Sequence, residues 1–343
     1  MRLCLVTNYV NGKYVNESLI LNKLINTLEL SPKDIFNFNN LNDAYKINKE
    51  YTHSLVLLDY KIASLPLYKE FLEEISIHKI FIVDTIPEKQ KELHEIFCNK
   101  FLKEHINNFT SLSLQHQTQL YKKYADGFIF YNKHDKKLFE TYYKNVPNKP
   151  TAVIPPSLGK KENIKLNLKN LKPNKLIGFN NSPSYSNGLL RLAETLLQLS
   201  DYSLDIYGSH GRTDIVNELL TNDITQPFNI SFRGKIKNQD KFFNLYHIYY
   251  NASLYDSFNY FSFLSIMNGV VPIISQNSGT SSYFKNYPFI VTDDPNSLKY
   301  NIELINNTPV NYLKNILSTA IEGLKELNDE NIKNQYYNFL NGF

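Results

Sequence analysis

The sequence of 343 residues lacks tryptophan, has only two cysteines and is poor in arginine. It also lacks any run of about 18 apolar residues, so we expect no segment that spans a bilayer. Cys4 and Cys98 form no CxxC pair, which excludes a disulfide framework and suits a reducing compartment. The amino terminus is a short apolar segment, too brief for a signal peptide. We therefore expect a cytoplasmic protein, with peripheral contact at the inner membrane face as an alternative.

The remaining composition is that of a globular protein with two domains. Hydrophobic residues make up 42% and charged residues 20% of the chain. A chain of 343 residues exceeds one average core and favours two domains of about 150 residues each. The formal net charge of +4 permits an anionic partner, such as a nucleotide, a nucleic acid or an acidic membrane surface. No long polybasic run demands such a partner.

Short apolar runs alternate with helical patterns in the first half, which is typical of βαβ units and a parallel sheet. Strands are predicted at 3–7, 54–58, 79–83, 127–131 and 151–154, and helices at 17–28 and from about residue 133 through Tyr143. Residues 1–156 are therefore predicted to form a first, Rossmann-like domain.

The same alternation restarts after residues 157–174, a stretch rich in Lys, Asn and Leu that we interpret as a linker. Strands are predicted at 175–179, 203–207, 230–232 and 289–291 and from Val270 on, and helices at 189–199, at 240–250 and after Pro295. Residues 175–325 are predicted to form a second Rossmann-like domain, and residues 326–343 a last helix.

The most informative segment is 252–275. It predicts a strand end, the turn Asp256-Ser257-Phe258-Asn259, an apolar helix, a stop at Gly269 and a second strand. Open α/β sheets bind their ligands outside the carboxyl ends of the strands. We therefore predict that the four residues of this turn contribute to a ligand site.

This segment resembles the sugar-nucleotide site of glycosyltransferases with the GT-B fold. In that family a strand, Glu-Gly-Phe-Gly, an apolar helix with a second Glu, and Gly-x-Pro-Val-Ile follow one another. Asp256 matches the first acidic residue. The second acidic position falls at Leu264 or Ser265, neither of which is acidic, although the Ser265 hydroxyl could make one hydrogen bond to a ribose.

The resemblance implies an α/β protein of two Rossmann-like domains facing each other across a cleft. It implies a nucleotide-sugar donor, with a UDP-sugar first, on the second domain, and no tightly bound metal. It also implies a last helix that crosses back onto the first domain. The acceptor would be a hydroxyl of a glycan, a glycolipid or a protein.

Further loops of the second half match places where the family holds the diphosphate or the base. The family's Arg and Lys positions hold Phe179 or Asn180, and Asn187, in this chain. Predicted donor-binding residues outside the turn are Asn181, Ser182, Arg191, Gly208, Ser209, His210, Arg212, Arg233, Lys235, Ile236, Ser265, Ser278, Gly279 and Thr280. The alternative is that the loops are polar surface turns and the basic side chains are merely solvated.

Two aspartates of the first half are candidate catalytic residues. Asp84 follows the predicted strand 79–83, and Asp59 follows the strand 54–58. A carboxylate at such a strand end could deprotonate an acceptor hydroxyl as a general base. The alternative for each is a helix-capping or turn aspartate.

The order of elements and the sequence Phe-Arg-Gly-Lys-Ile at 232–236 are also similar to those of T-even phage DNA glucosyltransferases. That resemblance keeps a DNA base as an alternative acceptor. A third reading is a non-catalytic GT-B module that binds a glycan or scaffolds a partner enzyme.

Overall fold

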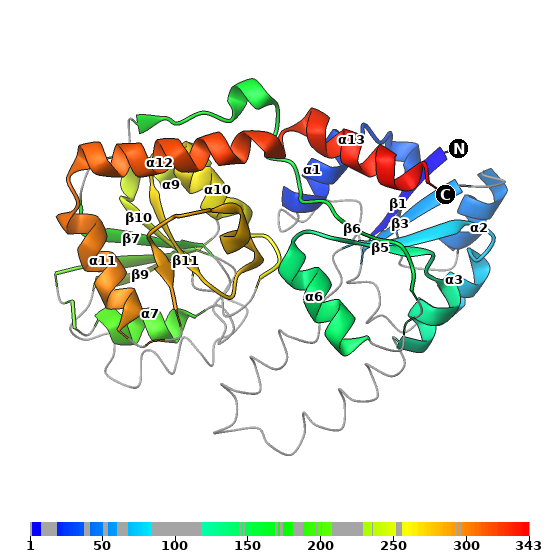
Figure 1. The fold of residues 1–343 in the computed structure, drawn as a ribbon, viewed down its shortest axis with the longest axis horizontal. Coiled ribbons are helices and arrows are strands. Elements are labelled where there is room, and N and C mark those ends of the chain that lie inside the picture. Colours follow the sequence, from blue (N-terminus) through cyan, green and yellow to red (C-terminus); the bar gives the residue numbers. More distant parts are fainter. Residues whose placement is uncertain are drawn as a thin grey trace, which may run out of the picture. The chain divides into compact units, whose positions relative to one another are not determined.

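The structure is a computed structural model of the whole chain. It describes residues 2–7, 19–37, 42–50, 54–59, 68–83, 118–143, 146, 148–168, 171, 174–180, 188–196, 198–199, 201–207, 229–234, 236–251, 256–292, 294 and 296–342. These residues divide into two compact units (Figure 1). Of the described residues, those up to 160 and from 327 on belong to the first unit, and those from 161 to 326 to the second.

The first unit contains a parallel sheet of six strands in the order β2-β1-β3-β4-β5-β6. Its strands are β1 (Arg2–Thr7), β2 (Ile35–Asn37), β3 (Ser54–Asp59), β4 (Lys79–Val83), β5 (Gly127–Phe130) and β6 (Thr151–Val153). Every pairing is parallel, and all side chains of β5 are buried. Strands covered on both faces read as near-continuous apolar runs, which is why most of these were predictable from the sequence.

Among the described residues, the first unit contains the helices α1 (Leu19–Thr27), α2 (Asn42–Glu50), α3 (Tyr68–Glu74), α6 (Lys133–Tyr142) and α13 (Asp329–Leu340), with the short turn η1 (Pro32–Asp34). Residues 118–124 are helical as well. The carboxyl-terminal α13 packs beside α1, so the last described residues complete the first unit (Figure 1). The rings of Phe81 on β4 and Phe339 on α13 meet edge to face, with centroids 5.6 Å apart.

The second unit contains another parallel six-stranded sheet, in the order β12-β11-β10-β7-β8-β9. Its strands are β7 (Leu176–Asn180), β8 (Ser203–Tyr207), β9 (Asn229–Gly234), β10 (Ile248–Asn251), β11 (Val271–Ser275) and β12 (Ile290–Val291). Its helices are α7 (Leu189–Leu196), α9 (Gln239–Leu245), α10 (Tyr260–Met267), α11 (Ser297–Asn307) and α12 (Val310–Leu324), with the turn η6 (Gly279–Tyr283). In this order the strand sequence reverses between β7 and β10, and such a switch point is where open sheets bind ligands.

The predicted helix at 240–250 is wrong in its second half. α9 ends at Leu245, Tyr246 is extended, and β10 follows at Ile248. Both Tyr249 and Tyr250 are buried, on opposite faces of the sheet because side chains alternate along a strand. Aromatic and aliphatic residues continue from the helix into the buried strand without a clear change of period, so the sequence did not show where the helix ends.

The helix α10 ends in a Schellman motif, as the predicted stop at Gly269 requires. The amide of Val270 donates to the carbonyl of Ser265 at 2.9 Å, and the amide of Gly269 to that of Ile266 at 3.0 Å. Gly269 has φ of +73°, and a Cβ atom there would lie 2.5 Å from the carbonyl oxygen of Asn167. Only glycine adopts this positive φ without strain and also leaves room for the Asn167 carbonyl. The chain then turns directly into β11.

Candidate functional site

The described part of the candidate site lies at the carboxyl ends of β10 and β11. Asp256 begins the turn after β10, and its two carboxylate oxygens accept hydrogen bonds from different elements. Oδ1 accepts from Ser278 Oγ at 2.5 Å and from Thr280 Oγ1 at 3.3 Å. Oδ2 accepts from Asn251 Nδ2 at 3.1 Å. The predicted residues Asp256, Ser278 and Thr280 are therefore brought together in one polar cluster.

Asn259 closes the turn and starts α10. Its side-chain oxygen accepts from the amide of Ser262 at 2.9 Å, the usual arrangement of an N-cap. Its own amide donates to Thr280 Oγ1 at 2.6 Å, and the phenol of the buried Tyr249 lies 3.5 Å from its side-chain oxygen. Burial raises the pKa of Tyr249, so this phenol stays protonated and can donate. Phe258, which precedes Asn259 in the turn, is buried, and its ring stacks on that of Phe263 with centroids 4.5 Å apart.

Every backbone amide of the loop 278–281 donates a hydrogen bond to another group of the protein. Ser278 N donates to Ser275 O, Gly279 N to Asp256 O at 2.7 Å, Thr280 N to Ser278 Oγ and Ser281 N to Ser278 O. The sequence suggested that these amides could bind a phosphate or a sugar. In the described conformation each already has a partner within the protein, so a ligand would meet the side chains and the outer surface of the loop.

The other members of the predicted set around α10 differ in exposure. Ser257 is half-buried within the turn. Ser265 lies on the buried side of α10, is fully buried, and donates from Oγ to the carbonyl of Phe261 at 2.7 Å. Its predicted contact with a ribose stays a prediction, and it would require this hydroxyl to leave its helix partner.

Arg191 on α7 holds the connection between β12 and α11. Its Nη2 donates to the carbonyls of Thr292 and Asp294 and lies 3.1 Å from Ser297 Oγ. The sequence predicted an Arg191 side chain that points back toward a diphosphate. The structure shows it bound to three oxygens of a neighbouring loop, and its role toward a donor stays a prediction.

Arg233 on β9 forms an ion pair with a buried carboxylate. Its Nε lies 3.0 Å from Oδ1 of Asp205, whose Oδ2 accepts from the phenol of Tyr246 at 2.6 Å. Tyr207 lies 2.9 Å from the same phenol. The hydrogen bond to Asp205 raises the pKa of Arg233, while burial and Asp205 raise that of Tyr246. Ile236, also in the predicted set, packs against a cluster of buried residues that includes Phe242, Phe243, Tyr246 and Tyr249.

Several predicted residues lie outside the described residues. These are Asp84, Asn181, Ser182, Gly208, Ser209, His210, Arg212 and Lys235. Asp59 is the last residue of β3, and its backbone pairs with Val83, the last residue of β4. Asp59 thus ends the strand that neighbours β4, the strand that Asp84 follows in the sequence, although neither side chain is described.

Sequence reasoning missed the contributions of Asn251 and Asp205. Asn251 is buried at the end of β10 and donates both to Asp256 and, at 3.3 Å, to Ser262 Oγ. Asp205 is buried in the middle of β8. The available signal was a polar residue within a mostly apolar strand, or at the end of one, because a buried polar group needs a partner.

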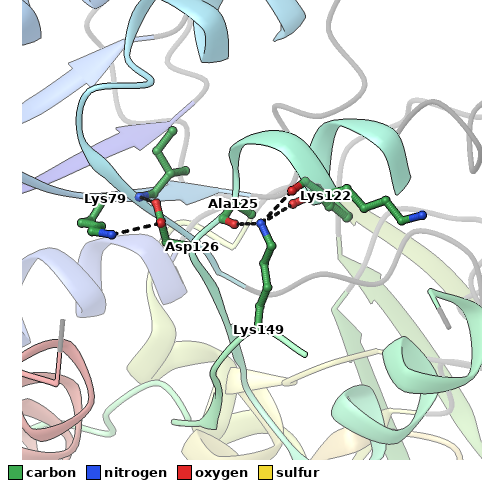
Figure 2. A network of polar contacts seen from close by, with 7 residues as sticks. Lys79, Lys122, Ala125, Asp126 and Lys149 are labelled. Atoms are coloured by element: carbon green, nitrogen blue, oxygen red, sulfur yellow. Dashed lines mark hydrogen bonds and ion pairs between the residues drawn. The ribbon is translucent and has the colours of Figure 1, made fainter. Parts of the chain in front are cut away.

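A separate polar network lies at the amino-terminal ends of β4 and β5 in the first sheet (Figure 2). Lys149 Nζ donates to the carbonyls of Tyr121 at 3.1 Å, Lys122 at 2.9 Å and Ala125, where a helix ends. Beside it, Asp126 accepts from the amide of Ile80 at 2.8 Å. Burial lowers the pKa of Lys149. These groups satisfy helix-end carbonyls and the start of a strand, which is a structural task.

Within the described residues, no helix is long and apolar enough to cross a membrane. Nor does that part of the chain contain a group of three or more His, Cys, Asp or Glu side chains placed to hold a metal ion.

Neither a protein-family model nor a curated protein matches this sequence. Solved structures do match. The UDP-forming α,α-trehalose-phosphate synthase from Burkholderia xenovorans, in complex with glucose-6-phosphate, has a TM-score of 0.71 at 14% identity over 99% of each chain. Sucrose-phosphate synthase from Thermosynechococcus elongatus has a TM-score of 0.69 at 12% identity, over 97% of this chain and 81% of the other.

TarM has a TM-score of 0.62 at 12% identity, over 88% of this chain and 58% of its own. These neighbours are GT-B glycosyltransferases. At sequence identities this low, the structural similarity shows a shared fold and nothing more about this chain. The two parallel six-stranded sheets with their helices, together with these neighbours, show that the chain has the GT-B fold.

Proposed function

We propose that the protein is a glycosyltransferase that moves a sugar from a nucleotide-sugar donor to a hydroxyl acceptor. The observation that carries the proposal is the polar cluster around Asp256, at the carboxyl ends of β10 and β11 beside the strand-order reversal of a GT-B sheet. This is the edge where open α/β sheets bind ligands. The fold match over nearly the whole chain supports the same reading.

The donor is proposed to be a UDP-sugar, bound by the second unit. Three of the similar structures carry the words UDP-forming in their names, which favours UDP over other nucleotides. Half-exposed Arg233 is a cation at the carboxyl end of β9, oriented by Asp205. Together with the predicted Arg212 and Lys235, it would supply positive charge for the leaving diphosphate.

The reaction needs a proton acceptor if the transfer inverts the anomeric carbon. The acceptor hydroxyl would give its proton to a carboxylate, its oxygen would bond to the anomeric carbon, and the bond from that carbon to the diphosphate would break. Asp84 is the proposed base, and Asp59 the second candidate. Their strands are neighbours in the first sheet, with Asp59 level with Val83.

The acceptor is proposed to be a glycan or a glycoconjugate, with a DNA base as the second choice. The net charge of +4 is compatible with either. A protein in the cytoplasm would meet a UDP-sugar there, and the cytoplasmic location is part of this proposal.

A non-catalytic GT-B module is the competing function, and one observation favours it. Where the family has its second Glu, the chain has Leu264 or the buried Ser265, whose hydroxyl donates to the carbonyl of Phe261. The family's Arg and Lys positions are also uncharged, at Phe179 or Asn180 and at Asn187. Binding without transfer would follow if these changes removed the stabilisation of the leaving group.

A donor screen decides between these functions. Thermal unfolding of the full chain would be followed with UDP, GDP, ADP and dTDP and their glucose esters, and sugar release would be measured in parallel. A donor at about 100 times its dissociation constant should add roughly 2.7 kcal/mol to the free energy of unfolding. Release of UDP from a UDP-sugar, increased by an acceptor mixture, would support transfer.

The alternatives have distinct outcomes in the same screen. Stimulation by hydroxymethylated DNA, and not by glycans, would favour the DNA base as acceptor. Binding of a glycan with no nucleotide effect at millimolar concentration would contradict the proposed transfer and favour the non-catalytic module.

A further inference from the structure

We infer that Asp256 is a positioning residue that locks the loop 275–283 onto the turn after β10, and that it is not itself a ligand of the donor sugar. The inference rests on the proposed function for what the locked surface binds. By the resemblance, Asp256 takes the place of an acidic residue in a sugar-nucleotide site, whereas the task inferred here is to hold two loops of the protein together.

The first argument is the number of partners that Asp256 has within the protein. Its carboxylate accepts from Ser278, Thr280 and Asn251, and its carbonyl oxygen accepts from the amide of Gly279 at 2.7 Å. A carboxylate offers about four lone-pair sites, so three side-chain donors leave little capacity for a sugar hydroxyl. The 2.5 Å bond from Ser278 is in the range of strong charge-assisted hydrogen bonds.

The second argument is where these partners come from. Asn251 ends β10, while Ser278 and Thr280 precede or begin η6, more than 20 residues further along the chain. Asp256 thereby ties two neighbouring loops at the carboxyl edge of the sheet. Each loop follows its own strand, and without such a tie their relative position would depend on packing alone.

The third argument is that the tie extends to α10. Thr280 Oγ1, which donates to Asp256, accepts from the amide of Asn259 at 2.6 Å. The Asn259 side chain in turn caps α10 through Ser262. Asn251 also lies 3.3 Å from Ser262 Oγ, so the first turn of the helix is held from both sides. Displacement of Asp256 would therefore shift the start of α10 together with the loop.

The test uses an exchange of the two partners. In Asp256→Asn the amide oxygen can still face Ser278, but the amide nitrogen faces the amide nitrogen of Asn251, and two donors oppose each other. Adding Asn251→Asp puts an acceptor opposite that nitrogen and restores the pairing. The introduced carboxylate can also accept from Ser262 Oγ once that hydroxyl turns away from Asn259 Oδ1, to which it donates at 3.2 Å in the wild type.

Binding of UDP and of UDP-glucose to the full chain would be measured by calorimetry, beside the midpoint of thermal unfolding. For a positioning residue, Asp256→Asn should weaken both ligands by about the same factor, on the order of tenfold for a lost net hydrogen-bond contribution of about 1.4 kcal/mol. It should also lower the midpoint by about 2–4 °C. The exchange variant should recover most of both losses.

The opposite pattern would overturn the inference. A direct sugar ligand predicts that Asp256→Asn weakens UDP-glucose and leaves UDP unchanged, and that the exchange variant restores stability without restoring affinity. An unchanged midpoint in Asp256→Asn would equally contradict it.

A second measurement covers the case in which the exchange variant does not fold. Amide hydrogen exchange at Gly279, whose partner is the backbone carbonyl of Asp256, should accelerate in Asp256→Asn and in Ser278→Ala, with no further increase when the two are combined. Ser282→Ala is the matched control, because its hydroxyl bonds to Gly279 O in the same loop and does not contact Asp256. Additive acceleration would show that the two side chains act independently and would overturn the inference. If the wild-type chain binds no nucleotide, the proposed function fails, and the exchange rates still decide the role of Asp256.

Discussion

Gly178 on β7 lies directly beneath the ring of Tyr246. A Cβ atom at Gly178 would come within 2.9 Å of Tyr246 Cγ and 3.0 Å of Phe242 Cζ. This close approach seats the aromatic cluster of Phe242, Phe243, Tyr246 and Tyr249 on the sheet. It also places the Tyr246 phenol on the buried Asp205.

Gly178→Ala should therefore destabilise the second unit. The added methyl group meets ring atoms within a packed core, where overpacking costs about 1–3 kcal/mol. Gly323→Ala on α12 is the control, because its Cβ would meet nothing within 4 Å and should raise helix stability by about 0.5–1 kcal/mol. Chemical denaturation of the wild type and both variants measures these changes in the free energy of unfolding. A Gly178→Ala variant as stable as the wild type would show that the aromatic cluster accommodates the methyl group by shifting.

Tyr121→Phe should stabilise the first unit. The Tyr121 phenol is buried and has no hydrogen-bond partner among the described residues. Its ring packs against Phe128 and Tyr143, contacts that phenylalanine keeps. Removing an unsatisfied buried hydroxyl should raise the free energy of unfolding by about 1 kcal/mol. Tyr124→Phe, which loses a 2.8 Å bond to Glu73, should give no such gain. A loss of stability in Tyr121→Phe would point to a bound water at the phenol.

Stability should fall in mild acid because of His247. Burial lowers the pKa of His247 from 6.5 to about 4, and neither ring nitrogen has a partner among the described residues. The folded state favours the neutral ring, so the unfolded state takes up a proton first as the pH falls. This contribution is complete above pH 6.5 and is lost between about pH 6.5 and 4, amounting to roughly 3 kcal/mol.

The measurement for His247 is a difference between two pH series. Urea denaturation of the wild type and of His247→Leu would be followed from pH 4 to 8, so that contributions of other groups cancel. The wild type should lose stability relative to the variant below pH 6.5, and a flat difference would show that His247 finds a proton acceptor when charged.

Asp329→Ala should loosen the carboxyl-terminal helix from the first unit. Asp329 Oδ1 accepts from Thr27 Oγ1 at 3.1 Å and from Ser157 Oγ at 2.5 Å, which joins α13 to α1 and to the segment after β6. Loss of this acceptor should cost about 1–3 kcal/mol. Glu330→Ala is matched for helix position and charge but is exposed, and should change stability by less than about 0.5 kcal/mol. Limited proteolysis near residue 327 should be faster only in the first variant.

Asp84→Asn should separate binding from transfer. Loss of a general base typically lowers turnover by about a hundred- to ten-thousand-fold. Donor affinity should stay unchanged, because the donor is proposed to bind the second unit. Transfer at the wild-type rate would remove Asp84 from the mechanism, and Asp59→Asn would then identify or exclude the neighbouring strand end as the source of the base.

Local pattern was sufficient for most of the sheet strands. β4 and β8 begin and end at the predicted residues, because each is a short apolar run bounded by polar residues and buried by its neighbours. The stop of α10 was also predictable, since a glycine after an apolar helix is a local signal. By contrast, β2, α2 and α3 were not predicted, because their apolar residues are few and their positions are stabilised by packing on the sheet.

The polar cluster at the carboxyl edge was decided by the tertiary structure. The sequence predicted that Asp256, Ser278 and Thr280 belong to one site, since each follows a strand whose end lies at that edge. It did not show that Asn251 belongs with them or that the aspartate would accept from all three. Hydrogen bonds between loops more than 20 residues apart depend on strand order and loop path, and both are set by packing of the whole sheet. The sequence by itself therefore determined the fold class and the strand ends at which a ligand site is predicted, and only the tertiary structure decided which side chains bind one another there.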